Sequence, residues 1–286
     1  MEVVRRLKRA SGQKRVGHGG TLDPVATGVV PVLFGQATRV MEYLINGTKD
    51  YRTEVRLGVE TDTYDSLGQV VRERDASSIT EEDVVKALES FKGAILQVPP
   101  MFSALKREGK RLYDLARAGG EVEREPREVV VESIEIVAGG APIAAVDVRC
   151  GRGFYVRSFA HDLGQALGCG AHMQSLVRIR TGPFVLDDAL SLEEAEVRLE
   201  AGDARNVLSS PDIVVRKLRA AVVGSKIEAM IKNGRSVPTA LGIPQAKSKE
   251  ECRVYTQDGR FLALIFFNPS EAQWQPSRVF DLNAPR

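Results

Sequence analysis

Two periods in the spacing of apolar residues predict a chain that mixes helices and strands. Val3, Val4 and Leu7 recur at helical spacing at the start of the chain, and Gly12 is placed to end that helix. Between residues 51 and 57 apolar and polar residues alternate with a period of two, which predicts a half-buried strand. The same reasoning predicts helices over 37–45, from 80 to 88, over 155–167, from 191 and over 225–232, and strands over 28–35, 129–150, 174–180, 253–255 and 261–267.

Particular residues sharpen several of these boundaries. Thr80 begins a capping-box-like segment that ends in Asp83, and Ser191 begins a second N-cap of the same type. Pro31 interrupts the apolar run 28–35, so the strand predicted there lies at an edge or carries a bulge. These residues therefore predict two helix starts and one strand irregularity that the spacing of apolar residues does not predict.

Breaks in the pattern predict two domains. At 286 residues the chain is long enough for both. A polar turn, Ser209-Ser-Pro211, separates a mixed α+β region, residues 1–208, from a small β-rich region, residues 212–286. Residues 97–125 contain a Pro-Pro pair and many charges, which predicts a protruding insertion with a short helix near 112–117.

Composition excludes several classes of protein. The chain is 43% hydrophobic and 27% charged, as in soluble globular proteins. No apolar run is long enough to span a bilayer, and the first residues lack the apolar stretch of a signal peptide. Three cysteines without a CxxC pair do not predict a disulfide framework. We therefore expect a cytoplasmic protein.

Charge is uneven along the chain although the net charge is only +2. Residues 1–20 hold six basic residues against one acidic, and residues 212–286 hold twelve against seven. A third basic cluster occupies residues 106–111. Solvated faces produce such clusters more often than phosphate contacts do, so the pattern alone only suggests RNA as a partner.

The densest candidate for chemistry is the glycine-rich segment 17–28. Its glycines permit sharp bends and a close approach to a ligand, and Pro24 fixes the backbone just after the carboxylate of Asp23. The spacing fits neither a phosphate-binding loop nor a dinucleotide-binding fingerprint. Taken alone, Asp-Pro is more often turn chemistry than catalysis, and both interpretations stay open from these residues.

The same segment resembles the catalytic motif of the TruB family of tRNA pseudouridine synthases. Four further segments match that family in the same order, so the resemblance spans nearly all of the first 185 residues. Residues 224–280 resemble, more loosely, the RNA-binding PUA domain that ends many members. The matching segments are Gly17-His-Gly-Gly-Thr-Leu-Asp-Pro-Val-Ala-Thr-Gly-Val-Val-Pro31, Lys49-Asp-Tyr51, Pro99-Pro-Met-Phe-Ser-Ala-Leu-Lys106 with Gly109 and Tyr113, Gly153-Phe-Tyr-Val-Arg157, and Asp162-Leu-Gly-Gln-Ala-Leu-Gly-Cys-Gly-Ala-His172.

The resemblance implies an α+β catalytic domain with a central mixed or antiparallel sheet flanked by helices and an RNA-clamping insertion. A small β-rich PUA-like domain would follow it. It also implies isomerisation of uridine: the N1–C1′ bond breaks, the uracil rotates, and a C5–C1′ bond forms. Because no redox change occurs, no cofactor is expected. A carboxylate suits this chemistry because it can attack a carbon and leave again.

The resemblance assigns roles to individual residues. Asp23 matches the catalytic carboxylate, and Arg157 matches an arginine that pairs with it and would keep it ionised and oriented. Tyr51 matches a tyrosine that stacks on the target uracil. Tyr155 and Leu176 match apolar pocket positions. For all except Asp23, a purely structural role in the core or on the surface is the competing interpretation.

Two further positions concern the RNA. His18 matches a histidine beside the flipped nucleotides, where a ring would offset part of the cost of extruding a base. Lys106 falls in the insertion that clamps the tRNA arm in the family, where phosphate contacts would strengthen binding without reading sequence. Only three histidines are present, and no Cys/His spacing suits zinc, so no metal site is expected.

The expected substrate is uridine 55 in the T-arm of tRNA, bound by a monomer without an obligatory protein partner. Two rival hypotheses are a guide-RNA-dependent synthase acting on rRNA and a non-catalytic tRNA-binding or tRNA-folding chaperone. Family members usually begin with a strand carrying Lys-Pro-x-Gly-x-Thr-Ser before the first helix, whereas this chain starts inside that helix. The expectation is therefore either a start upstream of Met1 or a truncated chain.

Overall fold

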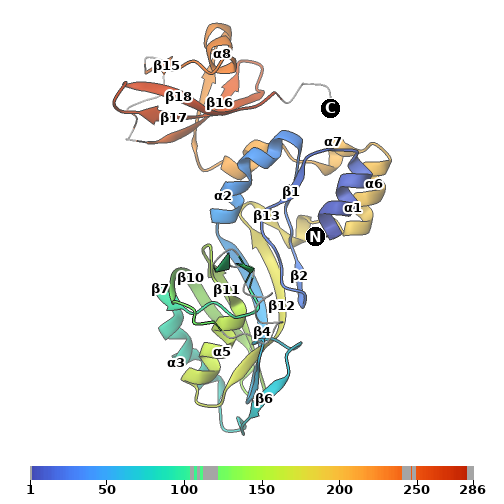
Figure 1. Cartoon of the computed structure of the whole chain (residues 1–286), viewed down its shortest axis with the longest axis vertical. Helices are drawn as coiled ribbons and strands as arrows, with labels where there is room; N and C mark the ends of the chain where they lie inside the picture. The colour runs from blue at the N-terminus through green and yellow to red at the C-terminus, as the bar shows by residue number, and fades with distance from the viewer. Residues whose placement is uncertain are drawn as a thin grey trace. The chain divides into compact units, whose positions relative to one another are not determined.

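A computed structural model describes residues 2–103, 106–107, 110–111, 122–239, 246 and 249–281. The chain forms two compact units, and each is interrupted in sequence (Figure 1). One unit consists of residues 1–19, 32–44 and 190–286, and the other of residues 20–31 and 45–189. The boundary predicted at 208–212 stays a prediction.

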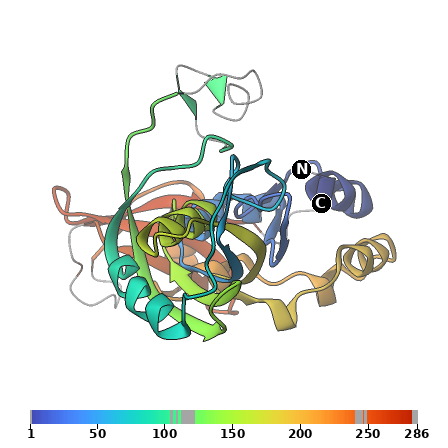
Figure 2. The same ribbon diagram turned by 90° about the horizontal axis from the view of Figure 1, so that it is seen from below.

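The second unit is built on a seven-stranded sheet whose strands are antiparallel except where β2 joins β12 (Figures 1 and 2). Its central strand β4 begins at Lys49 and ends at Leu57, with buried and exposed residues alternating as the sequence predicts. The order is β13 (Phe184–Val185), β12 (Ala171–Thr181), β4 (Lys49–Leu57), β11 (Ile143–Cys150), β10 (Arg127–Ala138) and β7 (Gly93–Gln97), with β2 (Ala26–Gly28) beside β12.

Helices α3 (Glu81–Leu88) and α5 (Val156–Ala166) pack on this sheet and close its hydrophobic core. The core contains Val55 and Val146 from the strands and Phe159 from α5, all fully buried. Burying such side chains stabilises the fold by about 1.5–3 kcal/mol each. The α+β architecture predicted from the sequence is thus confirmed.

Local signals explain where these helices begin. The Thr80 hydroxyl accepts from the Asp83 backbone N–H, and the Asp83 carboxylate accepts from the Thr80 N–H, which forms the predicted capping box. Helix α5 follows the N-cap residue Tyr155, and Gly168 just after it has a φ of +75°. The remaining elements of the unit are β5 (Val59–Thr61), β6 (Val70–Glu73), η2 (Glu89–Phe91), η3 (Leu186–Asp188), β8 (Lys106–Arg107) and β9 (Lys110–Arg111).

The first unit combines terminal helices with a second sheet. Helix α1 packs against α6, and Arg6 forms an ion pair with Glu193 at 3.1 Å. A five-stranded sheet in the order β14-β16-β17-β18-β15 carries the fully buried Trp274 on β18. The elements are α1 (Glu2–Ser11), β1 (Val16–His18), β3 (Val32–Phe34), η1 (Gly35–Val40), α2 (Met41–Asn46), α6 (Leu192–Glu200), α7 (Ala204–Val207), η4 (Pro211–Val215), β14 (Arg219–Val223), α8 (Ser225–Lys232), β15 (Val237–Pro238), β16 (Glu251–Thr256), β17 (Phe261–Asn268) and β18 (Gln273–Val279).

One predicted element is wrong, and one lies outside the described residues. The single strand expected over 28–35 is two strands, because β2 ends at Gly28 and β3 begins at Val32. Gly28 has a φ of +105°, Pro31 lacks an N–H, and the two strands pair with different partners, β12 and β1. The helix predicted near 112–117 falls on residues that the structure does not describe.

Candidate active site

The loop that carries Asp23 is held against the edge of the seven-stranded sheet. The Ala26 N–H donates to the Asp23 carbonyl at 2.9 Å, and β2 then runs parallel to β12. Gly28 permits this pairing, because a Cβ there would lie 2.3 Å from the Arg178 carbonyl oxygen. In this part of the glycine-rich segment, Gly28 therefore allows the backbone of β2 to lie close to that of β12 in a defined register.

Arg178 fixes the same loop from inside the sheet. It lies on β12, is 1% exposed, and donates from Nε to the Val29 carbonyl at 2.8 Å. Its other two nitrogens donate to the carbonyls of Thr21 at 3.3 Å and Gly20 at 3.1 Å. One buried guanidinium thus links three backbone positions around Asp23 to the sheet.

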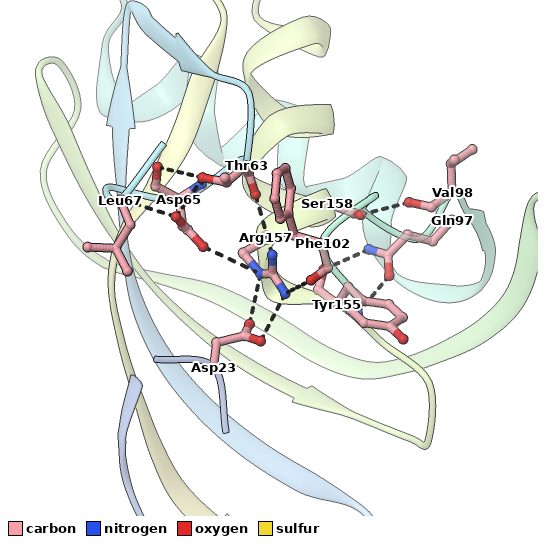
Figure 3. Close-up of polar contacts among 10 residues, drawn as sticks. All are labelled: Asp23, Thr63, Asp65, Leu67, Gln97, Val98, Phe102, Tyr155, Arg157 and Ser158. Carbon is pink, nitrogen blue, oxygen red and sulfur yellow. Dashed lines mark hydrogen bonds and ion pairs between the residues drawn. The ribbon is translucent and has the colours of Figure 1, made fainter. Parts of the chain in front are cut away.

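The Asp23 carboxylate is held by both sides of a guanidinium fork. Arg157 donates from Nε to Oδ2 at 2.8 Å and from an Nη to Oδ1 at 2.9 Å (Figure 3). Such bidentate pairing fixes orientation as well as charge. The Arg157 side chain is 4% exposed, whereas that of Asp23 is 33% exposed. The carboxylate is therefore fixed from its protein side and still accessible from solvent.

Arg157 has further partners that restrict it to one position. Asp65 Oδ2 lies 3.7 Å from its Nε, and the Phe102 carbonyl accepts from its Nη at 2.9 Å. The Asp65 side chain is 6% exposed and itself accepts from the Thr63 hydroxyl at 2.7 Å. Figure 3 shows Arg157 between the two carboxylates. A buried guanidinium with two carboxylates and a carbonyl around it has little freedom to move.

The start of α5 is anchored so that Arg157 points to this network. The Gln97 side chain accepts from the Tyr155 N–H at 2.7 Å and donates to the Tyr155 carbonyl at 3.1 Å. Three residues after Tyr155, the Ser158 hydroxyl donates to the Val98 carbonyl at 2.7 Å. The end of β7 and the residue after it thereby fix the first turn of the helix (Figure 3).

Two other predicted site residues are buried on neighbouring strands. Tyr51 on β4 and Leu176 on β12 are 9% and 5% exposed and belong to the core that α5 covers. Burial raises the pKa of the Tyr51 hydroxyl, and the positive charge of Arg178 opposes that shift. The negative charge of Asp23 acts on the same hydroxyl and raises its pKa further. Tyr51 is therefore a neutral phenol at pH 7.

Tyr155 is a half-buried residue at the N-cap of α5. Burial raises the pKa of its hydroxyl, and the charges of Arg157 and Asp23 act on it in opposite directions. Tyr155 therefore also carries a neutral phenol at pH 7. Tyr51, Tyr155 and Leu176 all lie in the unit that contains Asp23 and Arg157.

For the other two predicted residues, the structure gives the strand and the unit to which each belongs. His18 ends β1, opposite Val32 of β3, and belongs to the first unit. Lys106 lies on β8, which pairs with β9, and its side chain is outside the described residues. Among the residues that the structure does describe, no group of three His, Cys, Asp or Glu side chains could hold a metal ion.

Sequence comparison identifies the family. The N-terminal domain of TruB family pseudouridylate synthases matches residues 8–156, more than half of the chain. The chain belongs to the TruB family. The C-terminal domain of tRNA pseudouridylate synthase B matches residues 157–221. The tRNA pseudouridine synthase B of Dehalococcoides mccartyi is 41% identical over 99% of this chain and 93% of its own length. That of Symbiobacterium thermophilum is 49% identical over 82% of this chain and 77% of its own.

A solved structure supports the fold of this TruB family member. The chain resembles a chain in the crystal structure of a Cbf5-Nop10-Gar1 complex with a TM-score of 0.71 and 27% identity. The match covers 100% of this chain and 81% of that chain. The predicted family and α+β fold are therefore both confirmed. Within the described part of the chain, no helix combines the length and apolar character that spanning a membrane requires.

Sequence reasoning missed three residues that build this TruB-family site: Asp65, Arg178 and Gln97. Arg178 had a signal, because it lies two residues after Leu176 on a predicted strand and so shares its buried face. A charged residue at such a position requires a partner. Asp65 and Gln97 carried no local signal, since their partners are 92 and 58 residues away in sequence.

Proposed function

We propose that this chain converts uridine 55 of tRNA to pseudouridine, with Asp23 as the catalytic carboxylate. The observation that carries the assignment of Asp23 is its fork with Arg157. Nearly all of the guanidinium is buried, while a third of the Asp23 side chain reaches solvent. Similarity to tRNA pseudouridine synthase B over almost the whole chain supports the reaction and the substrate.

The reaction requires a group that acts at the sugar and then leaves. The N1–C1′ bond breaks, the uracil turns, C5 bonds to C1′, and the proton on C5 is lost while N1 gains one. Asp23 can attack C1′ or the uracil ring, or can help to form a glycal, and each route uses the same carboxylate. Arg157 acts in all three routes by fixing the direction of the carboxylate oxygens.

We infer that Tyr51, Tyr155 and Leu176 hold the detached uracil. Two neutral phenol rings and an aliphatic side chain provide an apolar wall on which a base can stack. Exclusion of water there would keep it from capturing the sugar before the new bond forms. The positions of these residues in the same unit as Asp23 support this role.

For binding, we propose a T-arm substrate contacted by His18 and Lys106. A ring at His18 would fill the stack that the extruded uridine leaves. Lys106 lies in a cluster of four basic residues on β8 and β9, which suits the phosphates of one RNA arm. We expect the chain to act as a monomer in the cytoplasm, without a guide RNA, a protein partner or a cofactor.

The test is incubation of the purified protein with unmodified tRNA and with a T-arm stem-loop, without any other macromolecule. We expect stoichiometric pseudouridine at position 55, detected by release of tritium from C5-labelled uridine. Activity only after addition of a guide RNA and partner proteins would favour the rRNA-modifying alternative. Binding of tRNA without tritium release would instead favour a chaperone.

A further inference from the structure

The turn from Thr61 to Asp65 supplies two of the contacts that hold Arg157. The Thr63 carbonyl lies 3.5 Å from an Nη of Arg157, and the Asp65 carboxylate lies 3.7 Å from its Nε. The turn is closed by the Thr61 hydroxyl, which donates to the Asp65 carbonyl at 2.7 Å. Anything that fixes this turn therefore fixes part of the environment of Arg157.

The residue between these two contacts is Tyr64, and its backbone is strained. Its φ is +64°, a conformation that costs a residue with a bulky side chain about 1 kcal/mol or more. Such a conformation persists only where neighbouring contacts hold it. Two backbone contacts do so: the Tyr64 N–H donates to Thr61 at 3.2 Å, and the Tyr64 carbonyl accepts from Met173 at 2.9 Å.

The Tyr64 ring provides a third contact. It stacks on the His161 ring, with centroids 4.0 Å apart and planes 14° from parallel. His161 lies four residues after Arg157 on α5, so both side chains project from the same face of the helix. Helix α5 therefore holds the turn at two points, through Arg157 at its first turn and through His161 one turn later.

The surroundings of His161 indicate that it contributes to the fold through the face of its ring. Its Nδ1 is buried and has no hydrogen-bond partner among the residues that the structure describes. Burial lowers the pKa of the imidazole, while the charges of Glu60 and Arg124 act on it in opposite directions. A neutral ring with a buried, unbonded nitrogen contributes to the fold through its planar surface.

We propose that Tyr64 and His161 are a pair of positioning residues for pseudouridine formation. Their stack fixes the turn 61–65, which sets the position of Asp65 and Thr63 against Arg157 and thereby the direction of the Asp23 carboxylate. The pair is assigned no contact with the reacting atoms and acts through Arg157. This inference rests on the proposed function, because its consequence is measured as a rate of isomerisation.

The test compares aromatic and non-aromatic replacements on both sides of the stack. We expect His161→Ala and Tyr64→Ala to lower kcat about tenfold, because small displacements of a catalytic group lower rates steeply. KM for tRNA should change less than twofold, since neither residue is assigned to binding. His161→Phe and Tyr64→Phe keep a ring in place and should retain kcat within threefold of the parent.

Several results would overturn the pairing. A folded His161→Ala protein with the parent kcat would do so, as would a His161→Phe protein as slow as His161→Ala. The double variant Tyr64→Ala/His161→Ala should be no slower than either single variant, and additive losses would contradict a shared role. His161→Leu fills the volume without a planar face, and if neither it nor His161→Ala folds, the stack serves stability alone and the proposal fails.

The parent protein assayed in parallel separates this inference from the proposed function. If the parent forms no pseudouridine on tRNA, the proposed function fails, and the positioning role fails with it. If the parent is active and the aromatic and non-aromatic variants are equally active, only the positioning role fails. Thermal unfolding of every variant shows whether the losses in kcat follow stability or site geometry.

Discussion

Two buried arginines in the same unit form hydrogen bonds with different kinds of partner. Arg157 on α5 directs its fork at carboxylates, with Asp23 at 2.8 Å and 2.9 Å and Asp65 at 3.7 Å. Arg178 on β12 directs its nitrogens at the backbone carbonyls of residues 20, 21 and 29. The first arrangement sets a charge and its direction, whereas the second sets the shape of a loop.

The comparison shows how two arginines divide the tasks of stabilising the loop that carries Asp23 and of orienting its carboxylate. Carbonyl groups carry only partial charge, so the fork of Arg178 holds the backbone without neutralising a side chain. Arg157 instead meets the one carboxylate of that loop and leaves part of it exposed to solvent. A loop fixed by its backbone can thus present a carboxylate whose orientation is controlled separately.

Among the variants that test the difference between the two arginines, the largest effect is expected for Arg157→Lys, which breaks the paired hydrogen bonds to Asp23. Arg157→Lys keeps the charge but cannot make two parallel hydrogen bonds to Asp23. We expect kcat to fall about 100-fold or more, with little change in KM for tRNA, because misorientation of a catalytic group acts on the chemical step. Single-turnover tritium release measures this.

A matched control for Arg157→Lys is available on strands β4 and β11 of the same sheet. Arg149 forms the same kind of fork with Asp50, at 2.9 Å and 2.7 Å, but its side chain is 47% exposed. Arg149→Lys should leave kcat unchanged, because Asp50 keeps a second partner in Arg180, whose Nε lies 3.3 Å from its Oδ2. Equal losses in the two variants would contradict the special position of Arg157.

The next largest effect is expected on stability, when the hydrogen bonds from Arg178 to the backbone are removed. Arg178→Met keeps most of the volume but removes three hydrogen bonds, one of them to the carbonyl of the buried Val29. Because a buried carbonyl left unsatisfied costs about 1–3 kcal/mol, and two further hydrogen bonds are lost, we expect the free energy of unfolding to fall by about 3 kcal/mol. Urea unfolding monitored by circular dichroism measures this. A stability equal to that of the parent would show that the loop does not depend on Arg178.

How much of the fold and of the site could be predicted depends on how far apart in sequence the interacting residues lie. Helix α8 and the capping box at Thr80 follow from local patterns, and the structure has them where the sequence predicts them. The break between β2 and β3 is not local, because it arises from pairing with two strands far apart in the chain. Asp65 and Gln97 could not be predicted for the same reason, because their partners lie 92 and 58 residues away in sequence.

The smallest effect tests a half-buried carboxyl on the same helix as Arg157. Burial raises the pKa of the Asp162 carboxyl from 3.8 to about 6. The carboxyl ionises less readily in the folded than in the unfolded protein, so stability declines as the pH rises from 3.8 to about 6 and stays lower above that.

Asp162→Asn removes this dependence. At pH 7 we expect the variant to be more stable than the parent by on the order of 1 kcal/mol, with allowance for partial solvent exposure. At pH 4 the two proteins should be about equally stable, and kcat should be unchanged. A variant less stable than the parent at pH 7 would show that the charged form has a favourable partner, as Arg157 provides for Asp23.

The most direct test of the central claim is the rate of pseudouridine formation by Asp23→Asn on tRNA under single-turnover conditions. Asparagine keeps the shape of the side chain but cannot act as a carboxylate nucleophile or base. We predict a rate lower than that of the parent by about 1,000-fold or more, with tRNA affinity within threefold of the parent. A rate within tenfold of the parent would contradict the assignment of Asp23 as the catalytic group.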